Sequence, residues 1–440
     1  MSALAENISL LYDSTKVYTN LNSENQGSSV LFDNGTSYTD ENVYGGFSSI
    51  LPIVLHNMTG LKEGENEDVV RKGPLVSRKV RDFFVIINMA IMAQIISVFG
   101  VVANIINIVV FIKQGFGEAM TVTLTGLAVA DLGTVTCQVW LSICWNPWFH
   151  YERLSLPFRP LHIEYLSAGH PRASSVRVSA WILALATFER CLCITIPFKV
   201  REIITPYRAR VFVIVVFVVN TACSVPFYYT SRIVPFFDSY LNRTYLVLTF
   251  TKDRQQIDNV FFAISVSLSV IPFLAVTIFT AVLVYSLDKA SKWRETVKIS
   301  EGNASKIENS GQTKQSAGNT DDAKKTQQRQ PNKNKRASKM VSLISTIFIA
   351  CNLPNVVNQL VMGIVPEYAK NGSYENINQT FWSLGYMIET INCSINIFMY
   401  YSMSTRYRNT LQDVFRTRCC PGKNADTARN EADVGVTERK

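Results

Sequence analysis

Several polar and ionisable side chains interrupt stretches of the sequence that are otherwise apolar. Asp131 lies within one such stretch, the pair Glu189 and Arg190 ends another, and Asn396 and Tyr400 lie near the end of the last. Charged and amide groups are expensive inside a membrane, so each is expected to have a partner or a function there. These residue types indicate a polar chain through a helix bundle. With four His and no nucleophile or metal-ligand spacing, we expect no enzyme.

The elements that must position these groups are seven apolar stretches. A helix needs about 20 apolar residues to cross about 30 Å of hydrocarbon. Because every backbone polar group must be satisfied within lipid, stretches of this length fold as helices and not as barrel strands. The sequence therefore predicts an all-α, seven-transmembrane helix bundle. Its spans are residues 83–112, 120–145, 174–196, 211–229, 260–285, 340–365 and 381–401.

The polar parts of the chain have separate roles. Residues 1–82 are expected to form a disordered, glycosylated extracellular arm, and residues 83–403 form the bundle. The segment at about 290–337 has almost no large apolar side chains, which predicts a disordered cytoplasmic loop. Residues 404–440 are expected to form an amphipathic helix and a cytoplasmic tail.

The amphipathic helix is predicted from the helical spacing of Tyr407, Leu411, Val414 and Phe415, with basic residues on the other face. Such a helix lies on the inner membrane surface and contacts membrane lipid. Cys419 and Cys420 follow it, where a lipid chain would reach the bilayer, so palmitoylation is predicted at both. The other cysteines lie in or beside the spans, which favours a role as packing residues.

The formal charge of +9 would suit nucleic acid, but its distribution indicates a membrane topology. Lys and Arg crowd the segment between spans five and six and the segment after span seven, which the positive-inside rule places in the cytoplasm. Basic residues just before span one oppose this orientation. The glycosylation motifs favour it, and we expect a multi-pass plasma-membrane protein with an extracellular N-terminus and no nucleic-acid partner. The predicted glycosylation sites are Asn7, Asn34, Asn57, Asn242, Asn371 and Asn378.

A set of motifs recurs in order along the spans. The set consists of Asn104, Asp131, Glu189-Arg190-Cys191, Pro272, Phe348 six residues before Pro354, and Asn396 four residues before Tyr400. It resembles the rhodopsin-like G-protein-coupled receptor family over residues 83–420, and the segment after Phe188 is similar to molluscan and other invertebrate neuropeptide-receptor-like and chemosensory-receptor-like proteins. The resemblance implies that an extracellular neuropeptide or chemosensory small molecule activates a heterotrimeric G protein. It implies that the coupling and switch residues are Glu189, Arg190, Pro272, Phe348, Pro354, Asn396 and Tyr400.

The sequence departs from this family at several positions. Tyr165 stands where the family has the helix-three Cys of its external disulfide, so that clamp is expected to be missing. Asn352 replaces the helix-six Trp, Ile397 the helix-seven Pro and Thr280 the helix-five Tyr. These departures put the usual switch in doubt.

The resemblance also implies an allosteric sodium ion, held by oxygen-bearing side chains. The corresponding residues are Asp131, Ser179, Asn392, Ser394 and Asn396. The alternative is a hydrogen-bonded polar core without an ion. No other cofactor is expected.

Charges in the external half indicate a ligand pocket. Arg172, Arg177 and Glu389 lie above the motifs, and Asn352 is grouped with them. An Arg there would hold an anionic ligand group, or Arg177 and Glu389 would neutralise each other. The rival class is a transporter or channel, since polar residues in a bundle also mark ion pathways. The absence of an inverted repeat in the sequence argues against it.

Overall fold

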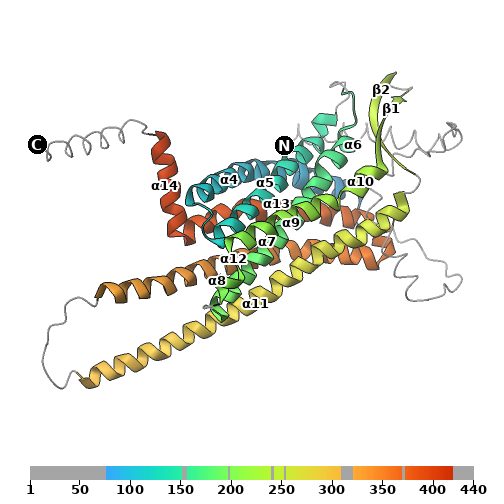
Figure 1. Cartoon of the computed structure of the whole chain (residues 1–440). Helices are drawn as coiled ribbons and strands as arrows, with labels where there is room; N and C mark the ends of the chain where they lie inside the picture. The colour runs from blue at the N-terminus through green and yellow to red at the C-terminus, as the bar shows by residue number, and fades with distance from the viewer. Residues whose placement is uncertain are drawn as a thin grey trace, which may run out of the picture.

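The computed structural model describes residues 76–150, 156–196, 199–238, 242–251, 254–308, 321–368 and 372–419. Over these ranges the chain forms a bundle of seven long helices, as predicted (Figure 1). A two-stranded sheet lies at one end, which we call the hairpin end, and helix α14 lies at the other, the α14 end.

Several bundle helices consist of more than one segment. Helix one comprises α3 (Arg78–Val85), a π-helical segment (Ile86–Met92) and α4 (Ala93–Gln114), and helix two is α5 (Ala119–Cys144). Helix three comprises α6 (Pro160–Glu164), a π-helical segment (Tyr165–Gly169) and α7 (His170–Thr195), and helix four comprises α9 (Pro206–Ala222) and α10 (Val225–Thr230). Helix five is α11 (Arg254–Glu308), helix six is α12 (Asp321–Ile364) and helix seven is α13 (Glu375–Met403). Short connections form α8 (Val200–Ile203) and two 3-10 turns (Pro147–His150 and Pro366–Tyr368).

The bundle is arranged for an apolar surrounding. Six helices of the described part are long and apolar enough to cross a membrane, namely helices one to six. Helix seven has 29 residues, but it is not among the six. Large apolar side chains such as Ile95, Ile214 and Val260 are more than 60% exposed, whereas Asn104 and Asp131 are buried. An outward apolar face around a polar interior suits lipid, and it would make a soluble protein aggregate.

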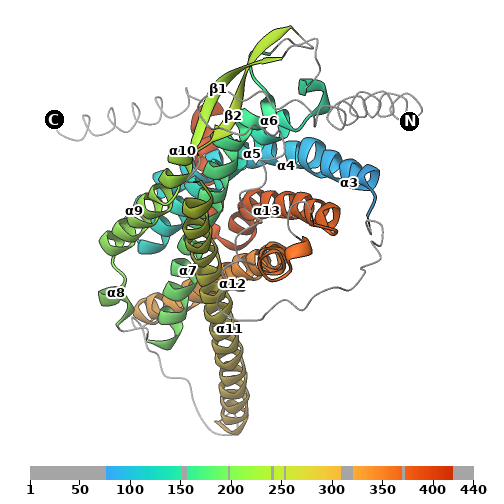
Figure 2. The same ribbon diagram turned by 90° about the vertical axis from the view of Figure 1, so that its right-hand side faces the viewer.

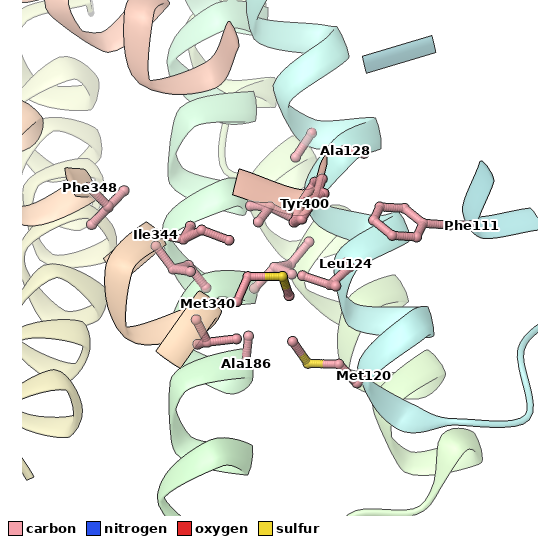
Figure 3. Packing of buried hydrophobic residues seen from close by; sticks show 14 of the residues in the cluster. Phe111, Met120, Leu124, Ala128, Ala186, Met340, Ile344, Phe348 and Tyr400 are labelled. Carbon is pink, nitrogen blue, oxygen red and sulfur yellow. The ribbon is translucent and has the colours of Figure 1, made fainter. Parts of the chain in front are cut away.

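The helices form a closed ring around helix three (Figure 2). Helix seven packs between helices six and one, so it belongs to the bundle despite its polar side chains. The main apolar cluster lies towards the α14 end, where Met340, Ile344 and Phe348 of α12 meet Ala186 of α7 and Tyr400 of α13 (Figure 3). Helix six is therefore packed against helix three in this conformation.

Helix three begins at Pro160, earlier than the predicted residue 174. The added turns carry His162, Glu164, His170 and Arg172, which lowered the apolar signal although all four side chains are buried. Polar residues that face the bundle interior lower the mean hydropathy of a span, so a hydropathy criterion misses that part of the helix.

The predicted disordered loop at 290–337 is largely helical where the structure describes it. α11 continues to Glu308 and α12 starts at Asp321, while residues 309–320 lie outside the described residues. A helix that is already anchored in the bundle extends without a new nucleation step, and Lys, Gln, Glu and Ala are good helix formers. Composition alone therefore overstated the disorder.

The amphipathic helix is confirmed as α14 (Thr405–Cys419). Tyr407 and Val414 are buried against the main cluster, and the Tyr407 hydroxyl donates to Asn107 Oδ1 at 2.6 Å. Burial raises the pKa of this hydroxyl, so it stays protonated and remains a donor. Arg406 also pairs with Glu118 at 3.1 Å, which ties α14 to the start of helix two.

A β-hairpin that the all-α prediction did not include joins helices four and five. β1 (Ser231–Asp238) pairs antiparallel with β2 (Arg243–Phe250). The hairpin is tied to the start of helix three: the Leu246 backbone N–H donates to the Pro157 carbonyl at 2.8 Å, and the Leu248 N–H donates to His162 Nδ1 at 3.0 Å. None of the seven cysteines whose side chains are described forms a disulfide with another described residue. Hydrogen bonds from two backbone N–H groups of β2 thus hold the hairpin where the resemblance would place a disulfide.

Candidate functional site

A cavity of about 490 Å³ lies at the hairpin end between helices one, two, three, five, six and seven. That volume is within the usual range for small-molecule sites, about 300–1,000 Å³. Met89, Leu141, Trp382 and Met362 give it an apolar wall. Charged residues of helices three and seven form the polar part of the lining. They are Glu164, Arg172, Arg177, Glu375 and Glu389, and Arg81 of helix one also lines the cavity.

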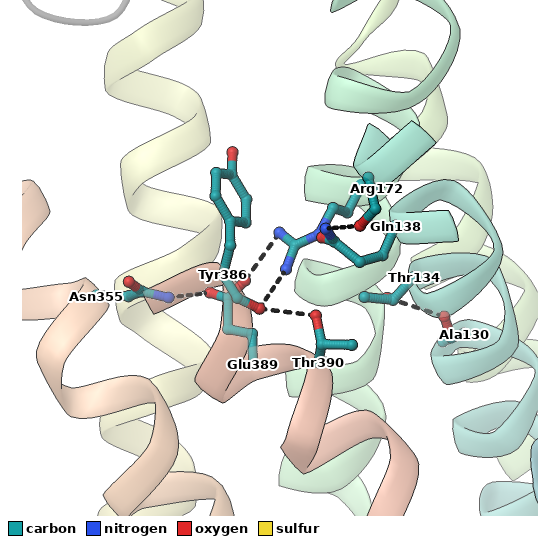
Figure 4. A network of polar contacts seen from close by, with 9 residues as sticks. Ala130, Thr134, Gln138, Arg172, Asn355, Tyr386, Glu389 and Thr390 are labelled. Atoms are coloured by element: carbon teal, nitrogen blue, oxygen red, sulfur yellow. Dashed lines mark hydrogen bonds and ion pairs between the residues drawn. The ribbon is translucent and has the colours of Figure 1, made fainter. Parts of the chain in front are cut away.

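Arg172 is the centre of a buried network (Figure 4). Its Nη1 pairs with Glu389 Oε2 at 2.9 Å, and its Nε donates to Gln138 Oε1 at 2.7 Å. The guanidinium also lies 3.9 Å from the centre of the Tyr386 ring. The second carboxylate oxygen of Glu389 accepts from Asn355 Nδ2 at 2.5 Å. The network joins helices two, three, six and seven through one neutralised charge pair.

The predicted alternative in which Arg177 pairs with Glu389 is wrong. Arg177 instead donates from Nε to Asn220 Oδ1 of helix four, at 3.3 Å. Five residues of α-helix rotate the side chain by about 140°, so Arg172 and Arg177 face different neighbours. Both line the cavity, but only Arg172 has an acidic partner among the described residues.

Asn352 does not join the other predicted pocket residues. Its side chain is buried and donates to the Phe348 carbonyl one turn earlier, at 2.9 Å. Asn355, three residues after Asn352 in the same helix, donates to Glu389 instead. Gly385 allows this contact, because a Cβ there would lie 1.6 Å from Asn355 Oδ1.

Only part of the predicted sodium group comes together. Ser179 Oγ donates to Asp131 Oδ1 and Asn396 Nδ2 donates to Asp131 Oδ2, each at 2.8 Å. Ser394 instead donates to the backbone carbonyls of Thr390 and Ile96, and Asn392 makes no hydrogen bond with a described residue. The oxygens of Asp131 and Ser179 would suit a small cation, but the contacts present are those of the hydrogen-bonded alternative. Sodium stays a prediction.

The two adjacent charged residues at the α14 end, Glu189 and Arg190, contact each other. Glu189 Oε1 and Arg190 Nη2 form an ion pair, and both side chains are buried. Next to them, the Thr187 and Ser345 hydroxyls lie 2.8 Å apart and link α7 to α12. The ion pair therefore leaves one oxygen of Glu189, Oε2, and one nitrogen of Arg190, Nε, without a hydrogen bond in the described part of the chain.

The two prolines weaken helices five and six at different depths. Pro272 has no N–H, so the carbonyl of Leu268 loses its helical partner. The Trp181 indole of helix three donates to that carbonyl at 3.1 Å, which joins helices three and five at this point. Pro354 lies within α12, between the main cluster and the cavity, close to Asn355. Phe348 and Tyr400 are both buried in the cluster below it.

The predicted modification sites differ in accessibility. Asn242 is exposed in the hairpin turn. Asn378 is buried, and its Nδ2 donates to the Tyr368 carbonyl at 2.9 Å, so a glycan there would require this side chain to leave its place. Cys419 is the last residue of α14. Asn7, Asn34, Asn57, Asn371 and Cys420 lie outside the described residues.

Sequence reasoning missed three members of the site. Gln138 and Asn355 hold the charge pair, and Glu164 lines the cavity. Gln138 and Asn355 are isolated amides within apolar spans, and that polarity was the available signal. Glu164 lay outside the predicted third span.

Comparison with known proteins gives one family. None of the curated protein sequences compared with this chain matches it. Residues 91–418 match the serpentine type 7TM GPCR chemoreceptor family Srw. The match extends from helix one to the end of α14 and includes most of the cavity and the Glu189–Arg190 pair. The chain therefore belongs to the Srw family of serpentine seven-transmembrane chemoreceptors.

Proposed function

We propose that this protein is a rhodopsin-like chemosensory receptor of the plasma membrane, which binds a small external molecule in the cavity and activates a heterotrimeric G protein at the α14 end. The observation that carries the proposal is the position of helix six. Gln359 and Met362 of α12 line the cavity, while Met340 and Ile344 of the same helix pack over α7 near Arg190. One continuous helix thus contacts both sites.

The mechanism follows from two packings of this helix. In the closed packing, the main cluster and the Thr187–Ser345 contact hold α12 against α7, and Arg190 is about 6% exposed. A ligand favours the open packing only if it binds that state more tightly. Bending at Pro354 would move the α14 end of α12 outwards and expose Arg190 to the G protein.

The orientation belongs to the same proposal. The hairpin end, with the exposed Asn242, faces outwards, and the basic surface of α14 faces the inner leaflet. Palmitoyl groups on Cys419 and Cys420 would anchor α14 there. A neuropeptide ligand is a less favoured alternative, because the family is one of chemoreceptors.

The proposal is tested by measuring nucleotide exchange on heterotrimeric G proteins and ion flux in the same expressing cells, while a panel of small water-soluble chemicals is applied. Exchange that depends on both the receptor and a chemical supports the proposal. Receptor-dependent ion flux without exchange would instead identify a transporter or channel.

A further inference from the structure

Two charges in the cavity lack a partner of opposite sign. Glu164 and Arg177 are 3% and 7% exposed, and both line the cavity. Glu164 makes no side-chain hydrogen bond or ion pair with a described residue, and the guanidinium of Arg177 makes one hydrogen bond, to the neutral amide of Asn220. Buried charges are normally paired, because their desolvation is otherwise uncompensated.

The nearby Arg172 does not supply the missing partner. It lies close enough to Glu164 to attract the carboxylate. Its own donors, however, are directed at Gln138, Glu389 and the Tyr386 carbonyl. The Arg172–Glu389 pair is therefore internally neutral, and Glu164 and Arg177 are left without an ion-pair partner among the described residues.

The two unmatched groups face the same space from one helix. Thirteen residues separate Glu164 from Arg177, so their Cα atoms are at most about 20 Å apart along helix three. Glu164 Oε1 lies beside Gly169, where a Cβ would be 3.4 Å away, so its carboxylate bends towards the C-terminal side. Long helical side chains such as Arg177 point towards the N-terminal side. The charged groups are therefore closer together than the backbone positions.

We infer that the cavity binds a zwitterionic small molecule, with its ammonium group at Glu164, its carboxylate at Arg177 and an apolar body between them. The apolar body would contact Trp145, Val176 and Trp382, which line the same cavity. Short peptides with free termini have this chemistry, because the residues between the two termini separate the ammonium from the carboxylate. The inference rests on the proposed function, since it names the ligand class of the proposed receptor.

The test uses the purified full-length receptor and a panel of dipeptides and tripeptides with aromatic or aliphatic side chains. Each compound is compared with its N-acetylated and its C-amidated form by the shift in receptor melting temperature. We expect at least one free-termini compound to stabilise the receptor, and each capped form to bind about 30-fold or more weakly, as expected for the loss of one buried charge pair. Equal stabilisation by capped and free forms, or no stabilisation by any compound, would overturn the inference.

Two variants assign the ends of the ligand. With Glu164→Gln, the N-acetylated form should bind as well as the free form, and with Arg177→Gln the same should hold for the C-amidated form. The matched controls are Glu367→Gln and Arg232→Gln, both exposed at the hairpin end, which should preserve the preference for free termini. The comparison of compounds on the unmodified receptor remains decisive if either variant fails to fold.

The measurements distinguish a wrong ligand class from a wrong assignment of G-protein coupling. Zwitterions that bind without stimulating nucleotide exchange would support the ligand class and contradict the proposed coupling. A chemical without a paired ammonium and carboxylate that stimulates exchange, while no zwitterion binds, would leave the coupling intact and overturn the ligand class.

Discussion

Arg172 of helix three and Glu389 of helix seven form a buried ion pair, 2.9 Å from Nη1 to Oε2, in the wall of the cavity. Arg172 is 1% exposed and cannot be hydrated in place. The pair is in turn oriented by Gln138 and Asn355, so four helices depend on one neutralised charge.

The pair predicts a specific pattern of rescue. Arg172→Met should strongly lower folding yield, because an unpaired buried charge typically costs about 3–5 kcal/mol. Adding Glu389→Gln should recover much of the yield, since no charge is then left alone. Fluorescence-detected gel filtration measures both. A double variant no better than Arg172→Met would show that the pair contributes nothing beyond its separate side chains.

The contact between helices six and seven depends on a missing Cβ. Gly385→Ala would place a methyl group 1.6 Å from Asn355 Oδ1, which must displace the amide from Glu389. We expect a clear fall in melting temperature. Gly117→Ala is the control, because no atom lies within 4 Å of the added Cβ. Similar melting temperatures for the two variants would contradict the close approach.

The hairpin should be indifferent to reducing agent. Dithiothreitol should leave the melting temperature unchanged, because no disulfide joins the described cysteines. Leu246→Pro removes the N–H that bonds the Pro157 carbonyl and should cost about 0.5–1.5 kcal/mol. Leu246→Val keeps that N–H and is the control. A marked loss of stability in dithiothreitol would reveal a disulfide, with Cys144 the first residue to examine.

Glycosylation tests the orientation. Asn57, Asn242 and Asn371 should each carry a glycan in cells, so that Asn→Gln at each shifts the glycosidase-sensitive band, whereas Asn303→Gln should not. Asn303 lies on the α14-end extension of α11, away from the hairpin end. A glycan on Asn303 would reverse the proposed orientation.

The bundle was predictable because a helix that crosses a membrane must have a certain length and an apolar composition, and both can be read directly from the sequence. The α14 helix was predictable for a related reason, since Tyr407 and Val414 recur on one face of a helix. The hairpin was not, because its strands lie in a connection with no span-length signal.

The partner of Arg172 was beyond sequence reasoning. Which face of helix three a residue occupies depends on the π-helical segment Tyr165–Gly169, whose wider turn changes the rotation of everything after it. Arg172 and Arg177 follow that segment in one helix and face different directions, and only the fold shows which of the two faces Glu389. Ser394 was likewise misplaced, because its hydroxyl bonds backbone carbonyls and not Asp131.

The most direct test of receptor function is Arg190→Ala, measured as nucleotide exchange on a heterotrimeric G protein at matched surface expression. Arg232→Ala, an exposed Arg at the hairpin end, is the control. We expect Arg190→Ala to abolish both basal and chemically stimulated exchange and to leave chemical-induced melting shifts intact, while Arg232→Ala signals normally. Full exchange by Arg190→Ala would contradict the central claim that this side chain, once freed from Glu189, engages the G protein.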